Sequence, residues 1–490
     1  MALDNRLLRD LASNEKKLWY KEIEKIKNNS SLRQLFHIEA PIGFLGDPNG
    51  FSFFQGSWYL FHQWIPRKTK RKMVYWRGLR SKDLVHWESL PYTIDPDTKY
   101  DSDGVYSGSA WVDKGKLEFF YTGNVRNNDN EREAYQMRAT LSENKISKEI
   151  IPAIKEPPHG YTMNFRDPKV WQQNGKNYVV IGAQTKEEKG CAIIYEASAN
   201  LKKWQFKSVL QPFDHSIGYM WECPNFFELD GHQVFIFCPQ GAEEKDLKYE
   251  TQFPNAVVIG PKWTDNNLEW QLNKPKLSLI DEGFESYAAQ IVQVESRTII
   301  VSWMGPNKTI LPTEALGWNG CLSLPRELSI QNGKLYQKPV QELKSLYGTK
   351  HVINFEQMAK FKTGLTSQFK VSFKGQGQVV WNLRAGNDNL GLLIKADLEN
   401  NTLEVDRQSV FEKEINDRVK GDTSRKIKLE LDNDELELEV WIDHTSFEIF
   451  IDQGKYILSG RIFTSEENQN CIFKINGPVE VKGTWHEIKY

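Results

Sequence analysis

Asp47 stands in the segment FLGDPNG, residues 44–50, where a proline and two glycines flank the carboxylate. Pro48 and Gly50 favour a tight turn, so one interpretation of Asp47 is an ordinary turn or capping acid. The other is a carboxylate held at a fixed point of the backbone, where it can act as a nucleophile. The segment alone leaves both interpretations open.

Two further acids stand in motifs that predict opposite protonation states. Glu222 lies in MWECPN, residues 220–225, and its neighbours Trp221 and Cys223 predict a weakly polar environment. Such surroundings favour the neutral carboxyl that a general acid requires. Asp167 follows Arg166 in NFRDP, residues 164–168, and the adjacent guanidinium should keep it ionised. The alternatives are a buried structural pair with an arginine for Glu222 and an ordinary ion pair for Asp167.

One carboxyl poised as an acid and a second kept ionised are what glycoside hydrolysis requires, and a third can hold sugar hydroxyls. The sequence contains no P-loop, dinucleotide fingerprint, HExxH zinc motif or nucleophile-elbow serine. Its 9 histidines are scattered, so a metal site has little support and no cofactor is expected. The three acids indicate a glycosidase, provided that the fold brings them together.

A strand pattern recurs about every 60 residues, and a fold built from such repeats could bring the three acids together. Each copy is a turn followed by β-branched and aromatic residues, and each follows another short strand, so each pair reads as a β-hairpin. Five hairpins predict a five-bladed β-propeller that ends near residue 340. An irregular β-sandwich with accidental similarity is the alternative. The five turns lie at Gly56, Gly115, Gly175, Gly231 and Ser296.

The innermost strands of a propeller surround its axis, so equivalent positions on the blades converge there. We therefore compare the residues about nine positions before each turn. They are Asp47, Tyr106, Arg166 next to Asp167, Glu222 and Tyr287. Three of the five blades thus place a carboxylate at or beside this point, which predicts one shared site.

The pattern changes after residue 345. Short strands, such as those at 378–383, 390–394 and 436–442, are separated by turns roughly every ten residues, which is typical of a β-sandwich. This region contains no cluster of catalytic residue types, so we expect a supporting domain. The predicted organisation is an N-terminal helical extension (1–36), a catalytic propeller (37–344) and a C-terminal β-sandwich (345–490).

The N-terminal extension has apolar residues at roughly helical spacing with lysines and glutamates between them. This pattern predicts a surface helix that packs on the body of the protein; a helix lying on a membrane is the alternative. The extension has no continuous apolar run, so neither a secretion signal nor a membrane span is expected. The 5 cysteines are scattered and odd in number, which fits a reducing compartment. Together these features predict a cytoplasmic protein.

The overall charge restricts the class of partner. Lysine plus arginine number 63 and aspartate plus glutamate 65, for a formal net charge of -2. Neither nucleic acid nor an anionic membrane is therefore expected as a partner. Aromatic residues make up 12% of the chain, including 16 tryptophans, which suits a large β protein and a sugar site alike. A small carbohydrate is the expected partner, and the oligomeric state stays open between monomer and homodimer.

Seven motifs occur in the order found in a known family. The chain resembles glycoside hydrolase family 32, the invertase and β-fructofuranosidase group, from about His37 to the C-terminus. The motifs are DPNG at 47–50, SGSA at 107–110, FYTGN at 120–124, RDP at 166–168, ECP at 222–224, LSLPREL at 322–328 and SFEIF at 446–450.

The resemblance implies a five-bladed propeller with a β-sandwich and a retaining mechanism without a cofactor. It implies that Asp47 is the nucleophile that forms a fructosyl-enzyme, that Glu222 is the acid/base, and that Asp167 stabilises the transition state. Gln63, Trp76 and Ser107 match substrate-contact positions of the family. The full set of predicted substrate-binding residues is Asn49, Gln63, Trp76, Ser107, Arg166, Cys223, Tyr287 and Trp318.

Three departures from the family pattern concern specificity. Gly46 replaces the usual Asn before the nucleophile motif, which removes an expected substrate hydrogen bond. Asn225 replaces the usual Asp after the ECP motif. After Trp76 the sequence reads Arg-Gly-Leu where the family commonly has Gly-His-Ala. All three carboxylates are retained.

The substrate is expected to be sucrose 6-phosphate, sucrose, or both. A basic run between Gln63 and Trp76 would suit a phosphate group on the leaving sugar, and a solvated loop is the alternative. A fructosyltransferase or fructo-oligosaccharide hydrolase with the same three acids, and a non-catalytic sugar-binding propeller, are the other candidates. The run contains the predicted phosphate-binding residues Arg67, Lys68, Lys70, Arg71 and Lys72.

Overall fold

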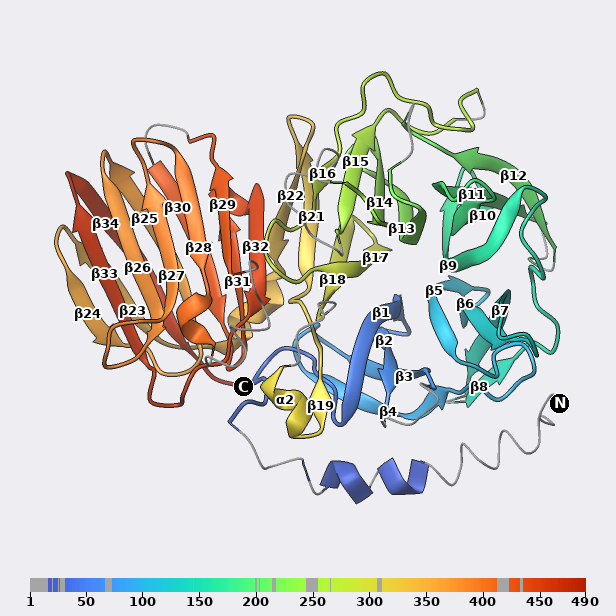
Figure 1. Ribbon diagram of the computed structural model, residues 1–490, viewed down its shortest axis with the longest axis horizontal. Coiled ribbons are helices and arrows are strands. Elements are labelled where there is room, and N and C mark those ends of the chain that lie inside the picture. The colour runs from blue at the N-terminus through green and yellow to red at the C-terminus, as the bar shows by residue number, and fades with distance from the viewer. Residues whose placement is uncertain are drawn as a thin grey trace.

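The computed structural model describes residues 16–490 apart from 20, 25, 27–30, 67–72, 144, 199–200, 202, 214–216, 244–253, 265, 306–310, 412–422 and 432–434. Strands dominate it, and near the N-terminus residues 16–19 and 21–24 are helical (Figure 1). Trp19 from this helical segment is buried against Trp64 and Tyr75 in edge-to-face contacts, so the segment packs on the body. Within the described residues, no helix is long and apolar enough to span a bilayer.

Five antiparallel sheets surround a central axis, with the first strand of each nearest to it (Figure 1). Blade 1 contains β1 (Gly43–Phe54), β2 (Ser57–Ile65), β3 (Tyr75–Ser81) and β4 (Trp87–Ile94). Blade 2 contains β5 (Val105–Asp113), β6 (Lys116–Arg126), β7 (Arg132–Ser142) and β8 (Lys145–Lys148). Blade 3 contains β9 (Tyr161–Gln173), β10 (Lys176–Thr185), β11 (Gly190–Ala197) and β12 (Trp204–Leu210). Blade 4 contains β13 (Met220–Leu229), β14 (His232–Gln240), β15 (Ala256–Gly260) and β16 (Ser278–Leu279). Blade 5 contains β17 (Tyr287–Val294), β18 (Arg297–Met304), β21 (Arg326–Gln331) and β22 (Lys334–Pro339).

The predicted turns join the first two strands of each blade. In blades 1 to 4 both turn residues have positive φ, as in Gln55 (φ 48) with Gly56 (φ 68) and Asp230 (φ 47) with Gly231 (φ 82). A two-residue turn of this kind matches the twist of the strands that it connects, and glycine adopts it without a steric cost. The turn chemistry of the sequence therefore fixes the hairpin from which each blade is built.

The ring closes between blade 5 and blade 1. The short strand β19 (Trp318–Asn319) pairs in parallel with the start of β1, where Gly43 lies opposite Trp318. It follows helix α2 (Pro312–Ala315) and precedes β20 (Cys321–Leu322), which pairs with β18. The chain that leaves blade 5 thus joins the strand that carries Asp47 before it returns to β21.

Two six-stranded sheets form the C-terminal sandwich. In order, one contains β23 (Tyr347–Phe355), β34 (Val479–Ile488), β25 (Ser367–Gly375), β30 (Glu435–Ile442), β31 (Ser446–Ile451) and β32 (Tyr456–Arg461). The other contains β24 (Ala359–Lys362), β33 (Asn470–Asn476), β26 (Gln378–Ala385), β27 (Leu392–Asp397), β28 (Thr402–Asp406) and β29 (Ser424–Lys428). Three 3-10 helices, η1 (Gln341–Leu346), η2 (Gln408–Val410) and η3 (Asp452–Gly454), complete the elements.

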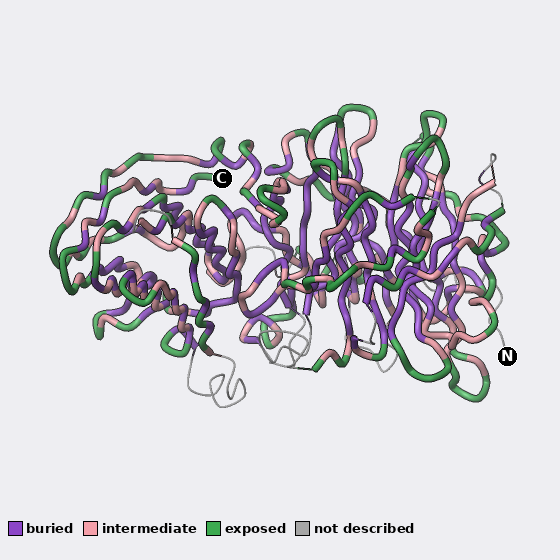
Figure 2. The backbone as a smooth tube through the Cα atoms, turned by 90° about the horizontal axis from the view of Figure 1, so that it is seen from above, coloured by how far each residue is buried: buried purple, intermediate pink, exposed green. Residues whose placement is uncertain are grey.

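Alternation of side chains explains the sandwich. In β30 the residues Leu436, Leu438 and Val440 are buried, whereas Glu437 is exposed, because successive side chains of a strand point to opposite faces. The buried faces of both sheets meet in one apolar core, visible as the purple interior in Figure 2. The prediction of a five-bladed propeller followed by a β-sandwich is confirmed.

The propeller and the sandwich are joined by buried charges. His37 Nδ1 lies 2.8 Å from Asp443 Oδ2, and His37 Nε2 lies 2.9 Å from Glu448 Oε1. Arg326 Nε donates to Glu448 Oε2 at 2.8 Å and Arg326 Nη1 to Asp281 Oδ2 at 3.0 Å. All five side chains are almost fully inaccessible to solvent. Two of the motifs found in the sequence, LSLPREL and SFEIF, therefore meet here through Arg326 and Glu448.

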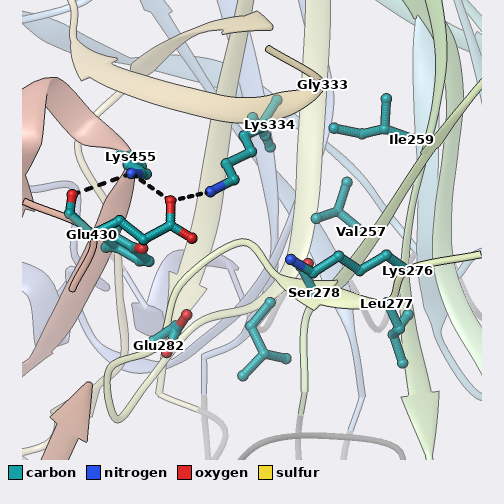
Figure 3. A pocket seen from close by; sticks show the side chains of 13 residues that line it. Val257, Ile259, Lys276, Leu277, Ser278, Glu282, Gly333, Lys334, Glu430 and Lys455 are labelled. Carbon is teal, nitrogen blue, oxygen red and sulfur yellow. Dashed lines mark hydrogen bonds and ion pairs between the residues drawn. The ribbon is translucent and has the colours of Figure 1, made fainter. Parts of the chain in front are cut away.

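An open cleft flanks the same junction (Figure 3). Its volume is ≈ 350 Å³, and β15, β16 and β22 of the propeller face the sandwich across it. Glu430 of the sandwich binds Lys334 of the propeller at 2.5 Å and Lys455 of its own domain at 2.9 Å. The three acids of the sequence motifs do not line this cleft.

The charge state of His37 couples the domain junction to pH. Burial alone would lower the pKa of His37, but the hydrogen bonds and charges of Asp443 and Glu448 raise it to about 9. A histidine with a raised pKa in the folded state contributes stability that is complete below its unfolded value of about 6.5 and is lost as the pH rises through 9.

We therefore expect His37→Gln to destabilise the protein most near pH 6.5, by up to about 3 kcal/mol, and progressively less toward pH 9.5. The measurement is the denaturation midpoint of both proteins at several pH values, with His159→Gln, at an exposed position, as the control. A difference that stays constant over this pH range would contradict the charged state assigned to His37.

Candidate active site

A β-bulge interrupts the first strand of every blade near the axis. The register shifts lie between Leu45 and Pro48 in β1, Tyr106 and Gly108 in β5, Arg166 and Lys169 in β9, Glu222 and Asn225 in β13, and Tyr287 and Gln290 in β17. Asp167, Cys223 and Ala288, inside three of these bulges, have positive φ (68, 49 and 52). A bulge redirects side chains and is frequent beside active sites. Here the bulges place the residues of the sequence motifs at the axis.

The register corrects one sequence prediction. Asp47 is equivalent to Ser107, Asp167, Cys223 and Ala288, because each stands two positions before a buried polar residue at the axis. Glu222 therefore precedes the equivalent position by one residue instead of occupying it. The count was wrong because β1 has a second bulge, between Asn49 and Ser52, that adds a residue to blade 1.

Asp47 is held by residues from blades 1 and 2. Ser107 donates its hydroxyl hydrogen to Asp47 Oδ2, and Gln63 Nε2 donates to Ser107 Oγ at 2.7 Å. Asn49 Nδ2 donates to the carbonyl oxygen of Asp47 at 2.8 Å, while its Oδ1 accepts the amide hydrogen of Gly108 at 2.9 Å. Three predicted binding residues thus surround Asp47. Two of them position it directly and the third acts through Ser107.

Glu222 lies among polar groups, contrary to the weakly polar environment predicted for it. Arg166 contacts Oε1 through Nε at 2.8 Å and Nη2 at 2.7 Å. On the other oxygen, Oε2 accepts hydrogen bonds from Gln240 Nε2 at 2.8 Å and from the Tyr287 hydroxyl. Trp221 and Glu222 pair regularly with β14 before the bulge begins, so their side chains point to opposite faces of the blade, and Trp221 does not set the environment of the carboxylate.

Asp167 is buried at the same axis. Its Oδ2 accepts the amide hydrogen of Cys223 at 3.0 Å, and its own amide donates to Thr122 Oγ1 at 2.9 Å. The Cys223 thiol lies 3.7 Å from Asp167 Oδ2 and 3.9 Å from Asp47 Oδ2. Cys223 therefore bridges two of the three acids, and the structure brings all three together.

Burial and mutual repulsion alter the protonation of the cluster. Burial, together with the charges of Asp167 and Glu222, raises the pKa of Asp47 to about 7, against a lowering effect of the Ser107 hydrogen bond. Burial and the charge of Glu222 raise the pKa of Asp167 to about 6, although Arg166 acts in the opposite direction. The charge of Arg166 acts on Asp167 in the predicted direction, but its guanidinium binds Glu222, and burial with the charge of Glu222 outweighs its effect on the pKa of Asp167.

A second ring of buried polar residues joins the blades behind the acids. Ser109 Oγ donates to the carbonyl oxygen of Pro168 at 2.9 Å, which links blade 2 to blade 3. Asn225 Nδ2 donates to the carbonyl oxygens of Cys223 at 3.0 Å and Ala289 at 2.8 Å. An aspartate could not donate these bonds, so the departure from the family pattern at 225 has a structural reason. The ring consists of Asn49, Ser109, Lys169, Asn225 and Gln290.

Some of the residues predicted to bind substrate or phosphate do not lie beside the three acids in the described structure. Trp76 is fully buried, and its indole nitrogen donates to the Tyr106 carbonyl oxygen at 3.1 Å, so the structure places it behind the strand that carries Ser107. Trp318 is 2% exposed; it donates to Glu39 and stacks under Arg33. Neither contacts the three acids. The basic run (Arg67, Lys68, Lys70, Arg71 and Lys72) lies outside the described residues.

Two residues of the cluster escaped the sequence prediction. Gln240 binds Glu222, and Thr122 binds Asp167. Both lie on the second strands of their blades, whereas the count of equivalent positions considered the first strands only. The sequence contained a signal for Gln240, because Gln184 stands at the same distance after the turn of blade 3. The side chain of Gln184 also points to this end of the propeller, where it binds Asn164.

Comparison with known proteins agrees with this architecture. The family model "Glycosyl hydrolases family 32 N-terminal domain" matches residues 37–339, and "Glycosyl hydrolases family 32 C terminal" matches residues 335–489. A sucrose-6-phosphate hydrolase from Staphylococcus xylosus is 35% identical over 91% of this chain and 90% of its own length. One from Bacillus subtilis is 32% identical over 95% of this chain and 97% of its own.

Solved structures give the same result. The sucrose-6-phosphate hydrolase from Lactobacillus gasseri superposes with a TM-score of 0.90 at 32% identity, covering 96% of both chains. A β-fructofuranosidase of this family from Bombyx mori superposes with a TM-score of 0.83 at 26% identity, covering 97% of this chain and 98% of its own. With both family models matched in order over nearly the whole chain, the protein belongs to glycosyl hydrolase family 32 and is a glycoside hydrolase.

Proposed function

We propose that the protein hydrolyses the β-fructofuranosyl bond of sucrose 6-phosphate with retention of configuration. The observation that carries this proposal is the cluster of Asp47, Asp167 and Glu222 at the axis, in which each acid has a different set of partners. Different surroundings give chemically similar carboxyl groups different roles. The name shared by the bacterial relatives supports the choice of substrate.

Asp47 acts as the nucleophile. Ser107 and the Cys223 thiol contact Oδ2, whereas no other described residue donates a hydrogen bond to Oδ1. In the proposed first step a lone pair of Oδ1 attacks the anomeric carbon of the fructosyl unit, and the bond to the glucosyl oxygen breaks. Asn49 fixes the backbone of Asp47, so the carboxylate approaches from one direction.

Glu222 supplies the proton to the leaving oxygen. Oε1 is bound by two nitrogens of the Arg166 guanidinium, whereas the partners of Oε2 are the Gln240 amide and the Tyr287 hydroxyl, which can also accept, so we place the acidic proton on Oε2. The Tyr287 hydroxyl beside Oε2 can donate to the ionised form and accept from the protonated form, so it accommodates both stages of the cycle. In the second step Glu222 removes a proton from water, which attacks the same carbon and releases Asp47.

Asp167 binds fructosyl hydroxyls and stabilises the positive charge that develops on the sugar ring. Its Oδ2 is occupied by the Cys223 amide, and within the described part of the chain no group donates to Oδ1. That oxygen is therefore available to a hydroxyl group. As an anion in a buried site, Asp167 acts on the transition state more strongly than a solvated carboxylate would.

Two substrates with different leaving groups can separate the roles of Asp47 and Glu222. We expect Asp47→Asn and Glu222→Gln each to lower kcat on sucrose 6-phosphate by roughly 10³-fold or more. With fructosyl fluoride, whose leaving group needs no proton, Glu222→Gln should accumulate a fructosyl group on the peptide that contains Asp47. Mass spectrometry of the digested protein detects this adduct, and Glu143→Gln, at an exposed turn, is the control. An adduct on another residue would overturn the assignment of Asp47.

The pKa of Asp47 sets the acid limb of the pH profile. Since the nucleophile must be ionised and its pKa is about 7, kcat/KM should fall about tenfold per pH unit well below that value. Ser107→Ala removes the bond that lowers this pKa, so the acid limb should move to higher pH by about one unit. The pH dependence of kcat/KM measures the shift, with Ser329→Ala in blade 5 as the control. A shift to lower pH would refute the role of Ser107.

The substrate assignment is tested by kcat/KM of the wild-type protein for sucrose 6-phosphate and for sucrose. A charged hydrogen bond to the phosphate contributes about 1.5–3 kcal/mol, so we expect a preference of at least about 10-fold for the phosphorylated sugar. Equal values would leave a β-fructofuranosidase that does not recognise the phosphate.

A further inference from the structure

Two arginines, Arg166 and Arg132, act electrostatically on each other near the acid/base, and within the described residues only Arg166 has a carboxylate partner. Arg166 binds Glu222. Arg132, on β7 of blade 2, forms no ion pair with any carboxylate of the described chain. Its contacts are Asn164 Oδ1, to which Nη1 donates at 3.3 Å, and the Tyr106 ring, whose centroid lies 5.7 Å from the guanidinium carbon.

The oxygen that Arg132 contacts connects it to the acid/base. Asn164 Oδ1 also accepts a hydrogen bond from Arg166 Nη1 at 3.1 Å. The orientation of this amide is fixed, because Asn164 Nδ2 donates to Gln184 Oε1 at 2.7 Å, and Gln184 Nε2 donates to the carbonyl oxygen of Tyr219 at 3.0 Å. A line of contacts therefore runs from Glu222 through Arg166 and Asn164 to Arg132.

The surroundings of Arg132 disfavour its charge. Burial, and after it the neighbouring charge of Arg166, lower the pKa of Arg132 below its usual range. On the paired strand Arg126 lies directly opposite Arg132, and like charges in this position destabilise a sheet. A guanidinium has five donor hydrogens, and the described contacts use few of those on Arg132. Arg126, Arg132 and Arg166 thus repel one another, while Glu222 is bound to Arg166, and an anion at Arg132 would offset that repulsion.

We infer that Arg132 is the specificity-determining residue that binds the phosphate group of the leaving sugar. This inference rests on the proposed function, since it concerns the sugar whose oxygen Glu222 protonates. The phosphate ester stands on the same sugar, several ångströms from that oxygen. Arg132 lies beyond Arg166 from the acid/base, since both arginines donate to Asn164 Oδ1. Its planar guanidinium can bind two phosphate oxygens at once.

The test measures kcat/KM of Arg132→Gln for sucrose 6-phosphate and for sucrose. We expect the ratio of the two values to fall at least about 30-fold relative to the wild type, mainly through KM for the phosphorylated sugar. Arg132→Lys keeps the charge but lacks the planar guanidinium, so its ratio should lie between those of the wild type and of Arg132→Gln. Arg80→Gln, at an exposed arginine on β3, is the control. Inhibition of sucrose hydrolysis by glucose 6-phosphate, compared with glucose, gives an independent reading of phosphate binding.

The outcomes separate this inference from the proposed function. If wild type prefers sucrose 6-phosphate and Arg132→Gln retains that preference, the inference is wrong and the proposed function stands. A combined Lys68, Lys70 and Lys72→Gln variant that alone abolishes the preference would transfer the role to the basic run. If the wild type shows no preference for sucrose 6-phosphate and no selective inhibition by glucose 6-phosphate, the proposed substrate is wrong. The denaturation midpoint of Arg132→Gln reports whether the variant is folded.

Discussion

The packing of three carboxylates around one axis is the constraint on which the rest of the propeller depends. Burial and mutual repulsion raise the pKa of Asp47 and of Asp167, so the cluster opposes its own ionisation. The chain compensates with Arg166 on Glu222, with the amide of Cys223 on Asp167 and with the hydroxyl of Ser107 on Asp47. Each compensating group comes from another blade, so the charges of the site also hold the ring together.

The bulges make this arrangement possible. A regular strand would alternate its side chains between the two faces of the blade. The extra residue in each first strand interrupts that alternation, which lets Arg166 bind Glu222 while its neighbour Asp167 lies at the same site. Directly behind them, the ring from Asn49 to Gln290 satisfies the backbone groups that the bulges leave unpaired. Function and fold therefore meet in the same few residues of each blade.

The repeated hairpins and the three acids could be predicted from the sequence because turn chemistry and strand composition are local properties. The partner of Arg166 could not, since its neighbour in sequence is Asp167 whereas its neighbour in space is Glu222. The second bulge of β1 contains Gly50, whose φ is 55. In the sequence this glycine indicates a turn around Asp47, so the count of equivalent positions missed the bulge. Trp76 and Trp318 show the same limit, because a tryptophan suits a blade core and a sugar site equally well.

The buried junction between the domains has a consequence for the order in which the chain can fold. The amides of residues 35–37, just before blade 1, donate to Asp443 of the sandwich, and β1 pairs with β19 from the other end of the propeller. During synthesis these partners leave the ribosome long after blade 1, so until then β1 and the amides of residues 35–37 lack these partners. The strand that bears Asp47 is thus among the first made and the last to be locked, and an incomplete chain has no assembled site with which to meet its substrate.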